Sequence, residues 1–86
     1  MNTNNKFQMQ PTITMKEVKF YLQNKKSFRW GSSTAMYDDN KDYILTSYAT
    51  VIARVNKDNE LVYFDDDYYS NTTRRFQNMI KEIFLK

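Results

Sequence analysis

The sequence predicts a small α+β domain: a three- or four-stranded antiparallel sheet with an N-terminal helix and a C-terminal helix packed on it. Three observations lead to this prediction. Apolar residues recur at helical spacing near both ends of the chain, short runs of β-branched and aromatic residues lie between them, and polar turns separate these runs. Because the links are short, neighbouring strands are expected to pair antiparallel. The predicted order is α-β-β-β-β-α, or α-β-β-β-α if the first short strand merges with its neighbour.

Length and composition set the domain organisation. The 86 residues allow one domain. A domain of this size hides only roughly 60% of the surface that its unfolded chain exposes. Residues 1–12 are polar and rich in asparagine, so we expect them to form a flexible N-terminal tail. Residues 13–86 then form a single α+β domain.

A helix of about ten residues is predicted to begin after Thr14. Thr14 and Glu17 have the spacing of a capping box. In this motif the Thr hydroxyl accepts a hydrogen bond from an amide of the first turn, and the Glu side chain accepts one from the amide of the cap residue. Apolar residues follow at positions 15, 18 and 22, on one face of a helix that ends near residue 24. The alternation of apolar residues over 13–22 also fits a strand, and the sequence alone leaves this alternative open.

Four strands are predicted in the middle of the chain, over residues 34–37, 43–48, 50–55 and 61–64. Polar residues at 38–42 and 56–60 form the turns between them. Residues 27–33, which hold the single Trp and the single Gly, are expected to form a loop leading into the sheet. Alternation over 50–55 predicts that Val51, Ala53 and Val55 share one face of the sheet. The other face then holds the alternate residues, Thr50, Ile52 and Arg54.

The C-terminal helix is predicted over residues 71–85. Ser70 is a favourable N-cap, and Asp65–Asp67 end the sheet before it. The apolar residues that follow recur at spacings of 0, 3, 4, 7 and 8: Phe76, Met79, Ile80, Ile83 and Phe84. Polar residues are predicted on the opposite face: Arg74, Gln77, Asn78 and Lys81. We therefore expect the apolar stripe to cover one face of the sheet.

Two segments, residues 47–53 and 68–76, resemble a known pair of motifs. The pair consists of a strand of the type Ser-Tyr-x-Thr-x-Val-Ala and a helix start of the type Tyr-Ser-x-Thr-Thr-x-Arg-His. The matching residues are Ser47, Tyr48, Thr50 and Ala53 in the first segment, and Tyr69, Ser70, Thr72, Thr73 and Arg75 in the second. The group with these motifs comprises small, functionally uncharacterised phage and prophage proteins. Ala49, Val51 and Phe76 depart from this group, which tends to have Asn, Pro and His there.

The resemblance covers about the C-terminal half of the chain. It implies a shared fold and a phage or mobile-element origin, and no enzymatic activity is associated with the group. From the residues themselves, Ser70 caps the helix, and Arg75 is expected to reach the Tyr48 ring, residues 65–67 or a strand-end carbonyl. The alternative is a ligand site, for example a phosphate held by the amides of residues 70–73 with Arg74 or Arg75 alongside.

Two absences narrow the chemistry. The sequence has no cysteine and no histidine, which excludes the usual zinc ligand sets and every catalytic scheme based on a thiolate or an imidazole. We therefore expect no enzymatic activity, no catalytic residue, no cofactor and no metal site. Asp38, Asp39, Asp42 and Asp65–Asp67 offer oxygen ligands, but without EF-hand spacing they are expected to form solvated acidic loops.

The apolar residues also bear on the cellular compartment. No apolar run reaches the roughly 18 residues of a membrane span, and the first five residues lack an apolar signal region. The absence of cysteine suits a reducing compartment. We therefore expect a protein of the host cytoplasm that does not interact with a membrane.

Charge is unevenly distributed along the chain. Residues 1–30 carry a net charge of +5, residues 31–70 carry −5 and residues 71–86 carry +3. We therefore expect a polarised molecule with a positive face and a negative edge. Eight basic residues are candidates for nucleic-acid binding, with Phe28 and Trp30 between them to stack on bases: Lys16, Lys19, Lys25, Lys26, Arg29, Arg74, Arg75 and Lys81. The alternative is a helix with snorkelling lysines beside a core Trp.

Tyrosine is the strongest compositional indication of function. The chain has seven tyrosines, more than so small a core hides, and exposed Tyr with Arg is favoured at protein interfaces. The protein-binding candidates are Tyr37, Tyr43, Asp65, Asp66, Asp67 and Tyr68. The leading hypothesis is a phage-encoded, non-enzymatic accessory protein that binds and modulates or inhibits a host protein, possible forms including an anti-CRISPR-like anti-defence inhibitor. The alternative is a small nucleic-acid-binding accessory factor. Either a monomer or a homodimer is compatible with the sequence.

Overall fold

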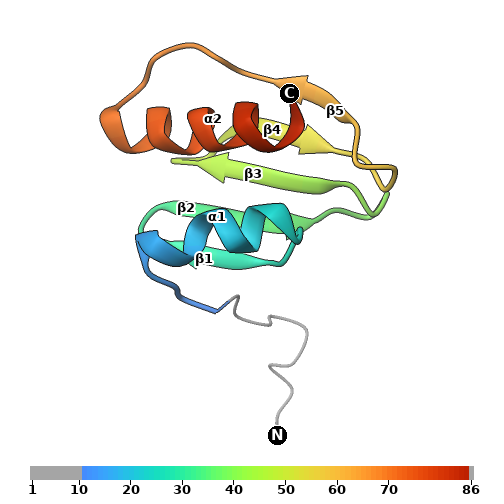
Figure 1. Ribbon diagram of the computed structural model, residues 1–86, viewed down its shortest axis with the longest axis horizontal. Coiled ribbons are helices and arrows are strands. Elements are labelled where there is room, and N and C mark those ends of the chain that lie inside the picture. Colours follow the sequence, from blue (N-terminus) through green and yellow to red (C-terminus); the bar gives the residue numbers. More distant parts are fainter. Residues whose placement is uncertain (1–10, 86) are drawn as a thin grey trace, which may run out of the picture.

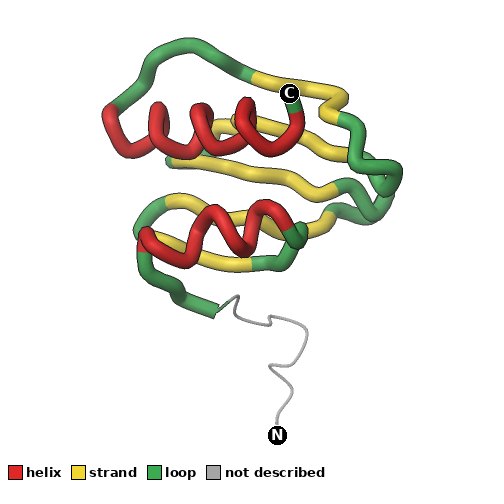
Figure 2. Tube along the Cα trace, in the orientation of Figure 1, coloured by secondary structure: helices red, strands yellow, loops and turns green. Residues whose placement is uncertain are grey.

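The computed structural model describes residues 11–85 and confirms the predicted fold class. The elements follow in the order α1 (Met15–Gln23), β1 (Phe28–Trp30), β2 (Ser33–Tyr37), β3 (Tyr43–Ser47), β4 (Thr50–Val55), β5 (Leu61–Phe64) and α2 (Asn71–Phe84). The five strands form one antiparallel meander in the order β1-β2-β3-β4-β5. Both helices lie over the same face of this sheet (Figure 1), and Figure 2 shows the resulting two layers.

Both predicted helices form, with the predicted caps. At the start of α1, the Glu17 carboxylate accepts from the Thr14 backbone amide at 2.9 Å and from the Thr14 hydroxyl at 3.1 Å. At the start of α2, Ser70 Oγ accepts from the Thr73 amide at 3.1 Å. The strand alternative for residues 13–22 is therefore wrong.

The expected loop over residues 27–33 is wrong, because it contains the short strand β1. Phe28 is buried and Arg29 is exposed, so the strand alternates, but three residues are too few to show a period in the sequence. The chain then reverses at Gly31, whose φ is +57°, and β2 pairs directly with β1. The sheet has five strands for this reason.

Residues 11–13 cover the outer edge of β1. The Arg29 amide donates to the Pro11 carbonyl at 2.8 Å, and the Ile13 amide donates to the Arg29 carbonyl at 3.1 Å. This contact is a single parallel bridge between Thr12 and Arg29. Pro11 and Thr12 of the predicted tail are thus placed beside the sheet, whereas residues 1–10 of that tail lie outside the described residues.

A β-bulge in β4 changes which side chains face the helices. Leu45 pairs with Ala53, but Thr46 pairs with Val51, which leaves Ile52 as the extra residue. Ile52 is fully buried, whereas Val51 is 37% exposed. The predicted faces of Val51 and Ile52 are therefore wrong, since Ile52 faces the core with Ala53 and Val51 does not. One inserted residue reverses the alternation beyond it.

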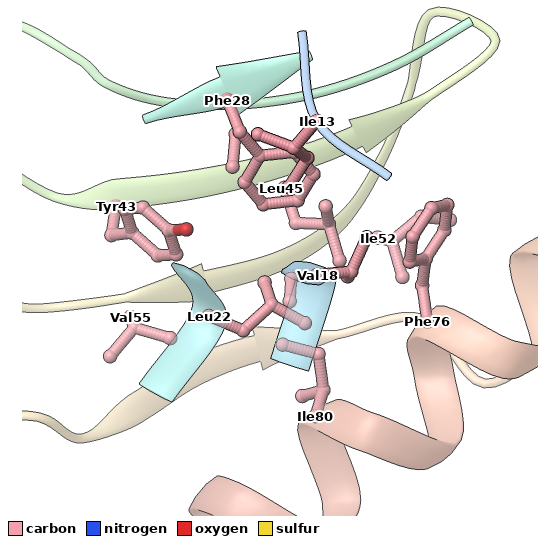
Figure 3. Close-up of a cluster of buried hydrophobic side chains, with 12 residues drawn as sticks. Ile13, Val18, Leu22, Phe28, Tyr43, Leu45, Ile52, Val55, Phe76 and Ile80 are labelled. Carbon is pink, nitrogen blue, oxygen red and sulfur yellow. The ribbon is translucent and has the colours of Figure 1, made fainter. Parts of the chain in front are cut away.

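The core lies between the two helices and the sheet, as Figure 3 shows. Helix α1 contributes Val18 and Leu22, and α2 contributes Phe76 and Ile80. The sheet contributes aromatic and aliphatic side chains from four strands: Phe28, Ala35, Tyr43, Leu45, Ile52, Ala53 and Val55. The predicted contact of the α2 stripe with one face of the sheet is confirmed. The opposite face carries no helix in the part of the chain that the structure describes.

Buried hydroxyl groups connect α2 to the end of the central strand β3. Ser47 Oγ lies 2.9 Å from Thr73 Oγ1 and 3.2 Å from Ser33 Oγ. These three side chains are at most 3% exposed. Ser47 belongs to the first segment of the motif pair and Thr73 to the second, so the two segments meet at this bond.

The β3–β4 hairpin turns through two non-glycine residues with positive φ. Tyr48 has a φ of +51° and Ala49 a φ of +68°, and Ser47 pairs with Thr50 on either side. This geometry is that of a type I′ turn, which favours Asn and Gly because other residues are strained there. Tyr48 and Ala49 therefore form a turn, and the first motif segment is not one continuous strand.

Replacing Thr73 by valine tests the buried hydroxyl bond. Valine keeps the shape but leaves Ser47 Oγ without this partner, so Thr73→Val should lower the free energy of unfolding by about 1–2 kcal/mol. Urea denaturation followed by circular dichroism measures the change. Thr72→Val, in the same turn and partly exposed, is the matched control and should change stability much less. Equal effects of the two variants would show that the buried bond contributes nothing specific.

Replacing Ala49 by glycine tests the strained turn. Glycine removes a steric cost of about 1–2 kcal/mol and adds an unfolded-state entropy cost of about 0.4–1 kcal/mol, so Ala49→Gly should stabilise the protein by up to about 1.6 kcal/mol. Ala35→Gly is the matched control, since Ala35 is buried within β2 and glycine should destabilise there. A destabilised Ala49→Gly protein would contradict the turn geometry.

Candidate protein-binding surface

Strand β5 and the loop that follows it form an exposed surface of aromatic, aliphatic and acidic side chains. This β5 surface consists of Val62, Tyr63, Asp65, Asp66, Asp67, Tyr68 and Tyr69. Its valine and three tyrosines are between 47% and 61% exposed. The loop runs from the end of β5 back to the start of α2 (Figure 1). Binding through this surface depends on how firmly the loop is held, which its contacts with α2 determine.

Gln77 of α2 fixes the backbone of this loop. Its side chain is fully buried, and its Nε2 donates to the carbonyls of Asp65 at 2.7 Å and Asp67 at 2.8 Å. The prediction of Gln77 on the polar face of the helix is therefore wrong. The spacing of Thr73, Gln77 and Ile80, at 0, 4 and 7, is a sequence signal that places Gln77 beside the buried residues.

Asp66 joins the loop to the basic side of α2. Its carboxylate lies 2.7 Å from Arg74 Nη1 and 3.1 Å from Lys81 Nζ. Lys81, and secondarily Arg74, hold the pKa of Asp66 below its ordinary value. The Arg74 guanidinium also lies 5.7 Å from the centre of the Tyr68 ring. Arg74, and not the predicted Arg75, therefore reaches the acidic loop.

Two tyrosines of the loop are held by hydrogen bonds. The Tyr69 hydroxyl donates to the Asp65 carboxylate, and the Tyr68 hydroxyl donates to Asn71 Oδ1 at 2.7 Å. The hydrogen bond to Asp65 raises the pKa of Tyr69 to about 12. Asp65 also accepts the Asp67 amide at 3.0 Å. The exposed rings thus stand on a loop whose conformation is set by internal contacts.

The other two protein-binding candidates lie elsewhere. Tyr43 is buried in the core, where its hydroxyl donates to the Lys26 carbonyl at 2.8 Å, and burial raises its pKa. Tyr37 is exposed on β2, and its hydroxyl donates to the Lys25 carbonyl. Because β3 and β4 separate β2 from β5, Tyr37 does not join the β5 surface. Of the predicted set, the structure brings together Asp65, Asp66, Asp67 and Tyr68.

Half of the nucleic-acid-binding candidates are engaged within the protein. Lys19 pairs with Glu82 at 3.0 Å, Lys25 Nζ donates to the Asn56 carbonyl at 3.0 Å, and Arg74 and Lys81 pair with Asp66. The remaining four are exposed on α1, the segment after it, β1 and α2: Lys16, Lys26, Arg29 and Arg75.

The rings proposed to stack on bases pack in the core or against it. Phe28 is fully buried, and Trp30 packs edge-to-face on Phe76 with ring centres 6.0 Å apart. Arg29 alternates with these two residues along β1 and therefore lies on the helix-free face of the sheet. The basic and aromatic candidates of this segment consequently do not form one surface.

Two groups at the start of α2 are likewise used internally. Ser70 Oγ accepts from the Thr73 amide, and Arg74 pairs with Asp66, so two of the groups named for a phosphate site already have protein partners. Among residues 11–85, no group of three or more His, Cys, Asp or Glu side chains is placed to hold a metal ion. No helix in the same range has the length and apolar composition needed to cross a bilayer.

The fold and its exposed side chains define a small α+β domain with an ordered tyrosine and aspartate surface. The chain belongs to a family described as "Family of unknown function (DUF8033)", whose model matches residues 15–83. The matched residues run from the start of α1 almost to the end of α2, so the family unit comprises the whole layered fold. No curated protein and no solved structure matches the chain significantly.

The ion pairs of Asp66 predict a pH-dependent contribution to stability. Since its pKa is lowered in the folded state, the contribution is present above the unfolded pKa near 4 and is lost as pH falls through the lower folded pKa. Asp66→Asn should therefore destabilise the protein at about pH 7 and match wild type at about pH 2. Urea denaturation at both pH values measures this, with the exposed Asp39→Asn as control. A difference that persists at the lower pH would rule out the ion pairs as its cause.

Proposed function

We propose that this protein is a phage-encoded, non-enzymatic accessory protein that binds a host protein in the cytoplasm and modulates or inhibits it. The β5 surface is its proposed binding site. An anti-defence inhibitor of the anti-CRISPR type is one specific form of this function. The phage origin is supported by the resemblance of residues 47–53 and 68–76 to motifs of phage and prophage proteins.

The observation that carries the proposal is an exposed aromatic surface on an ordered loop. Tyr63, Tyr68 and Tyr69 are each nearly half exposed or more, although a folded chain gains by burying such rings. Tyrosine is enriched at the energetic centres of protein interfaces. Because internal hydrogen bonds already hold Tyr68 and Tyr69, a partner would pay little of the ordering entropy that weakens binding by mobile loops.

The placement of the basic residues favours protein binding over nucleic-acid binding. Four of the eight basic candidates have internal partners, and the acidic residues of the β5 surface would repel a phosphate backbone. Nucleic-acid binding would have to rely on the exposed Lys16, Lys26, Arg29 and Arg75. Its expected signature is an affinity that falls steeply with salt.

Affinity capture from a host lysate tests the proposal. The immobilised protein should capture one host protein saturably, and the double variant Tyr63→Ser/Tyr68→Ser should lose it. Phe20→Ser is the matched control, since Phe20 is 55% exposed on α1, outside the β5 surface, and this variant should capture the partner normally. Equal loss by both variants would remove the β5 surface from the proposal. Recovery of salt-sensitive nucleic acid, with no saturable protein, would overturn it.

A further inference from the structure

We infer that the open edge of β5 accepts one extended, lysine- or arginine-rich strand of the partner protein, which extends the sheet by one antiparallel or parallel strand. This inference rests on the proposed function and specifies the partner's chemistry. A protein that adds a strand is recognised through backbone hydrogen bonds at the edge and through alternate side chains on the sheet faces.

The two edges of the sheet differ. Residues 11–13 cover the outer edge of β1, whereas β5 pairs only with β4 within residues 11–85. The strand sequence Leu61-Val62-Tyr63-Phe64 contains no proline and no charged residue, two devices that protect an edge. Its protection is limited to its shortness, four residues, and to a register shift that leaves Val62 as an extra residue opposite β4. Val62 is 53% exposed and Tyr63 48% exposed. The outward N–H and C=O groups of β5 are therefore free to pair with an added strand.

The charges beside β5 select a basic partner strand. Residues 56–67, which comprise β5 and its two flanks, carry one lysine and five carboxylates. Asp66 is neutralised by Arg74 and Lys81, but Asp58, Glu60 and Asp67 are exposed around the edge. Acidic groups at both ends of an apolar strand complement a partner segment with apolar alternate positions and basic ends.

The same charges disfavour a second copy of this chain at the edge. Antiparallel pairing of two β5 strands about their centre would place Glu60 of each copy opposite Asp65 of the other. Like charges directly opposite across two strands are destabilising. The edge is thus apolar enough to receive a strand, and its flanks oppose self-pairing.

The position of Tyr63 supplies a side-chain contact for the added strand. Tyr63 pairs with Arg54 in β4, and Ile44 pairs with Arg54 on its other side. These three residues form a row on the helix-free face of the sheet, and Tyr63 is its last member before the open edge. An apolar residue of the partner strand on this face would therefore pack against the exposed Tyr63 ring.

A synthetic peptide tests the edge directly. The probe has about nine residues, alternating valine and threonine with lysines at both ends, and its matched control has glutamates in place of the lysines. Backbone amide signals and hydrogen exchange of residues 61–64 are followed by nuclear magnetic resonance. The lysine peptide should shift and protect these amides and the glutamate peptide should not. Val62→Lys should weaken binding at least about tenfold through like-charge repulsion. Val51→Lys, on the inner strand β4, is the matched control.

Lysate capture with the same variants separates this inference from the proposed function. If Val62→Lys loses the captured host protein and Val51→Lys keeps it, while the lysine peptide competes with that protein, the edge is the docking site. If the host protein is captured by wild type and both variants alike, and the peptide leaves residues 61–64 unchanged, the inference fails and the proposed function stands. If the peptide binds but no host protein is captured, the proposed function fails and the edge remains a strand acceptor. Light scattering that shows a dimer with residues 61–64 already protected would assign the edge to a second copy and overturn the inference.

Discussion

The buried bond between Ser47 and Thr73 is the interaction on which the arrangement of this protein depends. It joins the end of the central strand β3 to the first turn of α2, two places far apart in the sequence. A hydroxyl inside an apolar core is costly without a partner, so the two side chains fix where the helix begins on the sheet. Once that point is set, the helical period carries Phe76 and Ile80 into the core and Gln77 to the backbone of the acidic loop.

The order of the β5 surface follows from the position of α2. Gln77 binds two loop carbonyls, and Arg74 and Lys81 bind the Asp66 carboxylate from the turns before and after Gln77 in the same helix. Each exposed ion pair alone stabilises the loop only weakly. The buried Gln77 side-chain amide and the Ser70 cap hold the same short segment, so the contacts together fix its conformation. The loop is therefore an extension of the helix packing, and its tyrosines are presented by a rigid support.

Sequence periodicity predicted the parts of this fold that contain several repeats of one period. The fourteen residues of α2 show the helical spacing, and the capping residues Thr14 and Ser70 mark both helix starts. The failures lie where the period is too short or is interrupted. Strand β1 has only three residues, and the bulge at Ile52 reverses the faces of its neighbours. Gln77 was predicted on the polar face because its side chain is polar, and a search for apolar residues does not detect a buried side chain that binds backbone carbonyls. The grouping of Asp65–Asp67 with Tyr68 could be predicted because these residues are adjacent in the chain.

The unequal edges of the sheet limit how large an assembly it can build. A sheet with two open sides can add strands without end, which is the route to fibrils. Here residues 11–13 occupy one side, so growth is possible on the other side alone. A partner strand that joins there, as proposed above, leaves the described part of this protein with no second open edge, so each copy accepts at most one strand. The asymmetry of this five-stranded meander thus limits strand addition to one side of each copy.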